Sequence, residues 1–188
     1  MIKKIEEFNQ HAAIAGFKNV TISNIEDFFQ TVQKKTGNTQ VQFFDASLTA
    51  GWQHLYFAAL NALNAFKNKR NFSNSLAIET LLFASAQRQI KKAMDMIGIK
   101  PAMSHVAVLV VAENEAKASA ALETISGILS AERDDGVLDF TDEKIDRVKK
   151  LFEISDLELG SKIGKDGSEK EALLDLVIER SALLITQR

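Results

Sequence analysis

The strongest helical pattern in this chain runs from Asn74 to Ile99. Apolar residues recur there at helical spacing and form a stripe wide enough to predict a mostly buried helix. These residues are Leu76, Ile78, Leu81, Leu82, Phe83, Ala86, Ile90, Ala93, Met94 and Ile97. Asn74 or Ser75 is expected to cap the first turn by accepting a hydrogen bond from a free backbone N–H. Gly98 and then Pro101 predict the end of the helix.

A basic ridge occupies the predicted solvent side of this helix, where Arg88, Lys91 and Lys92 have no acidic neighbour until Asp95. The whole chain has a net charge of −2, but residues 67–92 hold six basic residues and one acid, a local charge of +5. This distribution favours binding of a polyanion at one place only. The structural alternative is a solvated face, because the helix dipole favours cations near a C-terminal end without any ligand.

Shorter patterns predict a small sheet and further helices. The strands are expected within residues 12–22, at Val41–Ala46 and at residues 104–112, and the helices at residues 23–37, Leu48–Phe66 and residues 114–127. The third strand is almost continuously apolar, as expected for a strand covered on both faces. Ser23 with Glu26 is expected to cap the first of these helices and Asn114 the last, which Gly127 ends. Gly16 is a weak point within the first strand.

The order of these elements predicts an α/β (α+β) fold, with a small mixed sheet of three to four strands packed with helices and followed by C-terminal helices. Trp52 and Tyr56 are expected on the buried side of the second helix. The composition changes after Gly127, where the chain becomes acidic and turn-like. We therefore expect an α/β core domain at residues 1–130 and a C-terminal helical extension, packed on this core, at residues 131–188.

The extension contains two predicted helices with a glycine-containing loop at residues 154–167 between them. Thr141 is expected to cap the first helix, which runs to Phe152, and Ser168 with Glu171 to cap the second. The last helix carries two adjacent apolar stripes, one with Leu173, Val177 and Leu184 and the other with Leu174, Ile178 and Ile185. One stripe is enough to dock the helix on its own domain, so the other is available for a partner.

Catalytic and metal-binding patterns are missing from the sequence. The chain has no cysteine, and its three histidines show no ligand spacing relative to each other. His54 lies within a predicted helix, where a structural role with satisfied hydrogen bonds is favoured. No nucleotide-binding glycine motif and no nucleophile paired with a base is present. We therefore expect a binding subunit without a cofactor or metal. The missing signal peptide and membrane span favour a cytoplasmic protein.

The segments His54–Asn61 and Asn74–Ile99 resemble the PRPK-binding protein family, the small subunit of the KEOPS complex. The run E-x-L-L-x-A-S-x-Q-R-Q-I, which ends at Ile90, is the most specific part of this resemblance. The tail D-D-G-V-L-D-F-T-D-E-K-I-D-R-V-K-K-L-F-E-I is similar to archaeal members, and the resemblance covers about residues 41–188. Ala86 departs from the pattern, because family members often have glycine there.

The resemblance implies a non-catalytic subunit of the complex that makes the threonylcarbamoyl (t6A) modification of adenosine 37 in tRNA. Such a subunit binds the PRPK-type kinase and recruits tRNA through its single-stranded 3′ CCA end, which needs cations for phosphates and an apolar or aromatic surface for unstacked bases. The expected RNA-binding residues are Lys67, Lys69, Arg70, Ser85, Gln87, Arg88, Gln89, Lys91 and Ile97. The expected kinase-binding residues are Leu173, Leu174, Val177 and Ile178.

Two other functions stay open at this point. One is a regulatory subunit that tunes its kinase without direct tRNA binding. The other is a small-molecule-binding α/β enzyme, which would need a deep pocket with convergent titratable groups. Ser85 also has a structural alternative, because its hydroxyl can bond to the backbone one turn earlier.

Overall fold

The computed structural model describes residues 1–163 and 167–186. The chain forms two compact units, and each unit combines two separate stretches of sequence. The sheet unit consists of Met1–Ser47 and Gly98–Leu138, and the helical unit consists of Leu48–Ile97 and the described part of Asp139–Arg188. This division differs from the boundary expected at residue 130, because residues 48–97 pack with the C-terminal helices.

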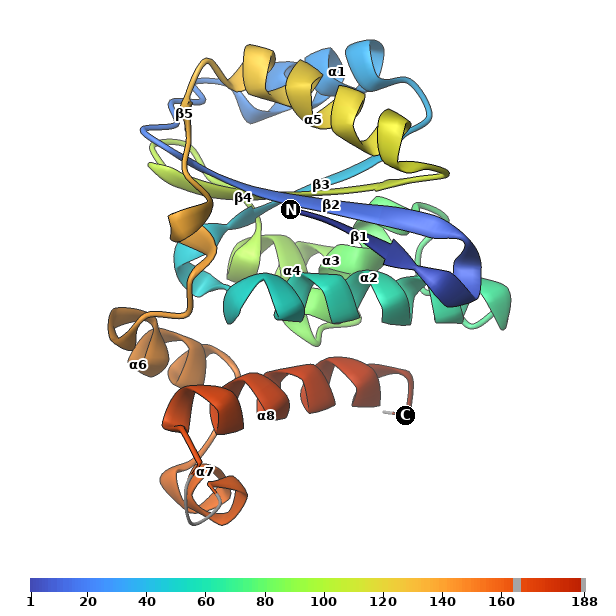
Figure 1. Ribbon diagram of the computed structural model, residues 1–188. Coiled ribbons are helices and arrows are strands. Elements are labelled where there is room, and N and C mark those ends of the chain that lie inside the picture. Colours follow the sequence, from blue (N-terminus) through green and yellow to red (C-terminus); the bar gives the residue numbers. More distant parts are fainter. Residues whose placement is uncertain (164–166, 187–188) are drawn as a thin grey trace. The chain divides into compact units, whose positions relative to one another are not determined.

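The sheet unit holds a five-stranded antiparallel sheet with two helices on one face (Figure 1). Its elements are β1 (Ile2–Ile5), β2 (Gln10–Lys18), α1 (Ile25–Thr36), β3 (Gln40–Asp45), β4 (His105–Ala112), α5 (Glu115–Leu129) and β5 (Glu132–Arg133), with 3-10 turns at Glu6–Phe8, Ala46–Leu48 and Asp135–Leu138. The strand order is β1-β2-β4-β3. The short strand β5 pairs with the C-terminal end of β2, which β1 does not reach. The mixed α/β class is confirmed. The strands β1 and β5 were not predicted, because each is too short to show a period.

The helix caps explain where the two helices of this unit begin and end. Oδ1 of Asn24 accepts hydrogen bonds from the backbone N–H of Glu26 and of Asp27, so the cap of α1 is Asn24 and not the predicted Ser23. Asn114 caps α5 as predicted. That helix continues through Gly127 and ends at Ser130, whose φ of 48° lies in the left-handed region.

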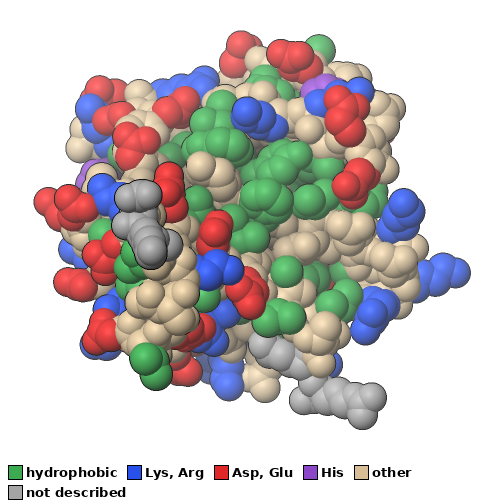
Figure 2. All heavy atoms as spheres, turned by 60° about the horizontal axis from the view of Figure 1, so that its bottom comes forward, with side chains coloured by type: hydrophobic (Ala, Val, Ile, Leu, Met, Phe, Trp, Pro, Cys, Tyr) green, Lys and Arg blue, Asp and Glu red, His purple; other side chains and the backbone are tan. Residues whose placement is uncertain are grey.

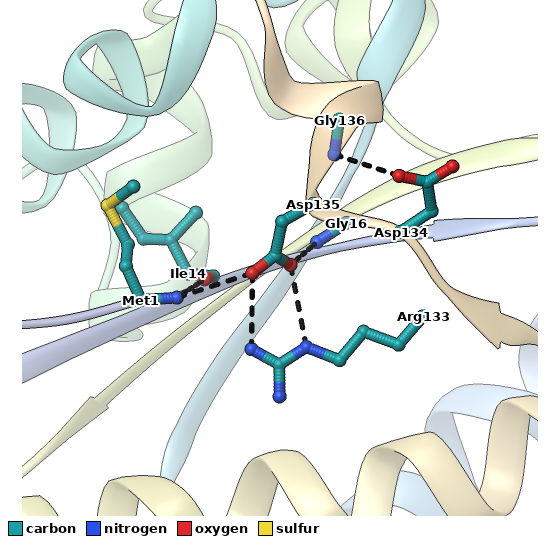
Figure 3. Close-up of polar contacts among 7 residues, drawn as sticks. All are labelled: Met1, Ile14, Gly16, Arg133, Asp134, Asp135 and Gly136. Atoms are coloured by element: carbon teal, nitrogen blue, oxygen red, sulfur yellow. Dashed lines mark hydrogen bonds and ion pairs between the residues drawn. The ribbon is translucent and has the colours of Figure 1, made fainter.

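Gly16 in β2 is in close contact with the chain that follows β5 (Figure 3). Its N–H donates to Oδ1 of Asp135 at 3.0 Å, and its carbonyl accepts from the N–H of Asp134 at 2.9 Å. A Cβ at this position would lie 2.4 Å from Cγ2 of Val137 and 2.5 Å from the carbonyl oxygen of Asp134. Glycine is therefore required here by close packing and not by its backbone angles.

The helical unit is built on α2, which packs against both α3 and α8. Its elements are α2 (Gly51–Lys67), α3 (Leu76–Ser85), α4 (Ile90–Ile97), α6 (Asp142–Leu151), α7 (Asp156–Lys162), α8 (Glu169–Leu183) and a 3-10 turn at Leu184–Thr186. The alanines Ala58, Ala59, Ala62 and Ala65 of α2 are completely buried. Their small side chains allow close helix packing, as the sequence indicated.

The single helix predicted for Asn74–Ile99 is wrong, since the chain turns after Ser85 and separates α3 from α4. Ala86 has a φ of 51°, in the left-handed region. The N–H of Ala86 donates to the Phe83 carbonyl and the N–H of Gln87 to the Leu82 carbonyl, both at 3.0 Å. These bonds form a helix-ending motif that usually contains glycine, so the alanine concealed the break.

The loop predicted at residues 154–167 contains a short helix, α7, capped by Ser155. Residues 164–166 of this loop lie outside the described residues. Ser168 precedes α8 as predicted, but its side chain makes no capping hydrogen bond. None of the helices formed by the described residues has the length and apolar character to cross a membrane.

Candidate nucleic-acid interface

The connection between α2 and α3 displays three of the predicted RNA-binding residues. Lys67, Lys69 and Arg70 are all exposed. Lys69 has a φ of 54°, and the N–H of Arg70 donates to the Ala65 carbonyl at 2.8 Å, which ends α2 sharply. This turn holds a short basic segment of defined backbone shape on the surface of the helical unit. Figure 2 shows one face of the molecule, on which Lys and Arg side chains lie along the right edge.

Glu79 in the first turns of α3 fixes the end of this basic connection. Its carboxylate accepts from the N–H of Phe72 at 3.1 and 3.0 Å and from the N–H of Ser73 at 2.8 Å. The side chain is completely buried, and this burial raises its pKa, although the two backbone hydrogen bonds act in the opposite direction. Glu79 is the one acid among residues 67–92, so its burial leaves the exposed charge of this region entirely basic.

Phe72 connects the basic connection to the turn between α3 and α4. The guanidinium carbon of Arg88 lies 4.9 Å from the centroid of the Phe72 ring, within the range of a cation–π interaction. Arg88 is exposed, and Phe72 is partly exposed. Arg88, from the turn before α4, therefore contacts the connection that carries Lys69 and Arg70.

Two of the predicted RNA-binding side chains are not on the surface. Ser85 is completely buried, and its hydroxyl donates to the carbonyls of Leu81 and Leu82 at 2.9 and 3.1 Å, which is the structural alternative given above. Ile97 is also completely buried, so it offers no surface for a base. The assignment of both residues to RNA contact is corrected. The burial of Ile97 agrees with its place in the apolar stripe that the sequence analysis identified.

The remaining residues of the predicted interface lie on or near the surface. Gln87 is half-buried, whereas Gln89 and Lys91 are exposed. Arg88 and Gln89 belong to the turn before α4, and Lys91 belongs to its first turn. Their assignment to RNA contact stays a prediction.

A cleft of about 650 Å³ lies beside Gln87 in the helical unit. Its other lining residues are Leu48, Ser85, Ala86, Met96, Arg147, Lys150, Leu151, Phe152, Glu153 and Arg180. Arg147 and Lys150, on α6, are exposed. Arg180 on α8 donates to both carboxylate oxygens of Glu158, at 3.0 and 2.9 Å, so its charge is already paired. The sequence analysis missed these cations, because they lie far from residues 67–92 in sequence.

His54 in α2 has a structural role. Its Nε2–H donates to the Ala84 carbonyl at 2.7 Å, and its Nδ1 accepts from the N–H of Ala50 at 3.3 Å. The ring is completely buried, and burial lowers its pKa to about 4. The expected structural histidine is confirmed. In the part of the chain that the structure describes, no three His, Cys, Asp or Glu side chains are grouped to hold a metal ion.

The two apolar stripes of α8 differ in burial. Leu173 and Val177 are completely buried in the core of the helical unit, so their assignment to partner contact is corrected. Leu174 and Ile178, from the second stripe, are only partly buried. The first stripe therefore docks α8 on its own unit, and the second stays available for a partner.

An aromatic ridge on α2 was also missed by the sequence analysis. The rings of Trp52 and Tyr56 lie 6.4 Å apart, and those of Tyr56 and Phe57 lie 5.6 Å apart. Phe57 is 37% exposed, and the other two rings are partly buried. Trp52 and Tyr56, expected on the buried side of α2, are only partly buried, because alanines, His54 and Leu55 form the fully buried face of this helix. Aromatic side chains that are at least partly exposed, as these are, are enriched at protein interfaces.

Comparison with known proteins identifies one family and one relative. The model of the family described as kinase binding protein CGI-121 matches residues 17–184. The relative is the regulatory protein Cgi121 of the archaeon Methanocaldococcus jannaschii. It is 32% identical over 113 residues, which make up 60% of this chain and 70% of the relative.

Proposed function

This chain belongs to the CGI-121 family of kinase-binding proteins, and from that premise we propose that it is the non-catalytic, tRNA-recruiting subunit of a KEOPS complex. In this role the chain binds the single-stranded 3′ CCA end of tRNA and holds the PRPK-type kinase. The complex then carries out the t6A modification at adenosine 37. A cytoplasmic location is part of the proposal, because the substrate is tRNA.

The observation that carries the RNA part of this proposal is the contact of Arg88 with Phe72, an aromatic residue in the same connection as Lys69 and Arg70. Lys69 and Arg70 precede the aromatic ring in sequence, and Arg88 lies over it. A single-stranded RNA end needs this combination of cations for phosphates and a flat surface for bases. Arg147 and Lys150 are further cations, and they line the cleft beside Gln87.

The kinase part of the proposal rests on the apolar surface of the helical unit. The family is named for kinase binding. Leu174 and Ile178 form a partly exposed stripe on α8, and Phe57 belongs to an aromatic ridge on α2, the helix against which α8 packs. Apolar and aromatic side chains on neighbouring helices suit a stable protein partner better than an RNA strand.

A second candidate function is a kinase-regulatory subunit without direct tRNA binding. Two observations favour it: the net charge of −2 and the pairing of Arg180 with Glu158, which reduces the positive charge of the cleft. In this case the basic surface around Lys69 would be a solvated face.

Gel filtration of the chain with its kinase and with tRNA separates the two functions. The first function predicts that the isolated chain shifts tRNA to a larger complex and that adding the kinase gives one species with all three components. The second predicts a complex of chain and kinase that leaves tRNA at its free elution volume. Failure of the chain to bind the kinase would contradict both functions.

A further inference from the structure

The outer face of α2 carries no charge. Between Asp45 and Lys67 the sequence has no Asp, Glu, Lys or Arg, and the one histidine of this stretch, His54, is buried. Five large apolar side chains recur at helical spacing on the face opposite the buried alanines, and each is at least partly exposed; they are Trp52, Tyr56, Phe57, Leu60 and Leu63. An uncharged helix face that is rich in aromatic residues has the composition of the core of a protein interface.

Helix α8 runs beside α2 in the same direction. Nδ2 of Asn61 donates to Oγ of Ser181 at 3.4 Å, and further along both segments a guanidinium nitrogen of Arg70 donates to the Ile185 carbonyl at 3.5 Å. The second contact lies C-terminal to the first on both segments. The first half of α8 therefore lies beside the first half of α2.

The charges of this two-helix surface are divided between its ends. The three cations of residues 67–70 are exposed where α2 ends. Glu171 and Asp175 are exposed in the first half of α8, seven and three residues before Ile178, so they lie on the same side of that helix as its partly exposed apolar stripe. The α2–α8 surface is thus basic at one end, acidic at the other end and apolar between them.

A second copy of the same chain complements this distribution of charge. In a two-fold contact the same surface meets itself, so a surface with one sign of charge would repel its copy. When two copies of α2 pack in antiparallel directions, the uncharged faces meet, and the basic end of each copy lies over the acidic end of the other. An RNA strand would instead be repelled by the acidic end.

We propose that two copies of this chain pair through the α2–α8 surface in an antiparallel, two-fold contact. Phe57, which is 37% exposed near the middle of α2, is the central anchor of this contact. Two helices from each copy form a small interface, so the dimer is weak and depends on concentration. The contact covers Leu174 and Ile178, which the proposed function assigns to the kinase, so the kinase and the second copy compete.

Light scattering after gel filtration, from low to high micromolar protein, tests the pairing. The mass of the wild type is expected to rise from one chain to two. Phe57→Glu is expected to raise the dissociation constant of the dimer about tenfold or more, because a two-fold contact carries the change twice at its centre. Leu157→Glu is the matched control, since it places the same charge at an 85% exposed leucine on α7. That helix packs on the side of α8 that carries Arg180, so wild-type masses are expected.

A charge exchange tests the antiparallel arrangement. Glu171→Lys with Asp175→Lys is expected to weaken the dimer about threefold to tenfold, and so is Lys69→Glu with Arg70→Glu. All four changes together are expected to restore it, because the acidic and basic ends then exchange places in both copies. Thermal melts check that every variant folds.

Three results would overturn the pairing. One is a wild type with the mass of a single chain at every concentration. If that monomer binds the kinase through Phe57, the kinase is the occupant of this surface and the proposed function stands. The second is a dimer of wild-type strength in Phe57→Glu. The third is a four-residue exchange that leaves the dimer as weak as either pair of changes alone.

Discussion

The backbone N–H of Gly16 donates a hydrogen bond to Oδ1 of Asp135 at 3.0 Å, across 119 residues of sequence. Asp135 is also the partner of Arg133, at 3.3 Å, and of the Met1 amino group, at 3.7 Å (Figure 3). Its pKa is lowered by the hydrogen bond from Gly16 and by these charges, although its partial burial acts in the opposite direction. The ionised carboxylate thus links β2 to the turn that follows β5.

Gly16→Ala is expected to destabilise the protein by about 2–4 kcal/mol, because the added Cβ overlaps the Asp134 carbonyl and Val137. Urea unfolding measures this change. Gly127→Ala is the control, since a Cβ at this helical position has no neighbour within 4 Å. It is expected to be neutral or to stabilise by up to about 1 kcal/mol. Equal stability of the two variants would contradict the close packing at Gly16.

Stability is expected to fall as the pH is lowered from about 6.5 to about 4, because His54 is neutral in the folded state. Its pKa is about 4 when folded and 6.5 when unfolded, so the unfolded chain binds the additional proton in this window. The full loss is on the order of 3 kcal/mol. Glu79 has the opposite effect, because a raised carboxyl pKa favours the folded state as the pH falls.

Urea titrations at several pH values isolate the contribution of His54. His54→Gln is expected to be less stable at pH 8, by about 2 kcal/mol, and to lose most of the slope between pH 6.5 and 5. His105→Gln, which changes an exposed histidine, is expected to keep the wild-type slope. A slope that survives in His54→Gln would assign the pH dependence to other groups.

Changing Lys69 and Arg70 to Glu is expected to weaken tRNA binding more than tenfold at low salt and to reduce its salt dependence. Both residues are exposed, so the fold should survive, and each lost phosphate contact lowers the slope of log Kd against log salt by about one. Filter binding across a salt series measures both effects. The control is Lys34→Glu with Lys35→Glu on α1 in the sheet unit, for which wild-type binding is expected.

Leu174→Glu is expected to abolish association with the kinase while leaving tRNA binding intact. Leu174 is partly buried at the edge of the core, whereas Leu173 beside it is completely buried. Leu173→Glu is therefore the contrasting variant, expected to unfold the helical unit by placing a charge in the core. Co-elution with the kinase, together with a thermal melt of each variant, distinguishes loss of kinase binding from loss of the fold. If Leu174→Glu also unfolds the protein, Leu174 belongs to the core and not to the interface.

Local signals in the sequence predicted much of the fold. Asn114 caps its helix, β4 is almost continuously buried, and the two stripes of α8 separate as their spacing indicated. The break at Ala86 was missed, because alanine takes a left-handed conformation there that normally indicates glycine. An alanine in this conformation gives no local signal in the sequence that the helix ends.

Of the candidate site, only the exposed cations could be predicted from the sequence. Lys69, Arg70 and Arg88 are revealed by their charge. Ile97 is buried, as its place in the apolar stripe indicated, so its assignment to RNA contact was not consistent with the helical spacing. Phe72 was overlooked, because its contacts with Arg88 and Glu79 are not indicated by any motif. Arg147 and Lys150 could be assigned to the cleft only from tertiary structure.

The most direct test of the central claim compares two forms of one tRNA, with and without its terminal CCA, for binding to the isolated chain. Recognition of the single-stranded end predicts that removing CCA costs most of the binding, at least tenfold in Kd at near-physiological salt. If the chain bound RNA only through its phosphate charge, removing CCA would change Kd little, because three nucleotides carry a small part of that charge. Equal affinity for both tRNAs would contradict recognition of the 3′ end.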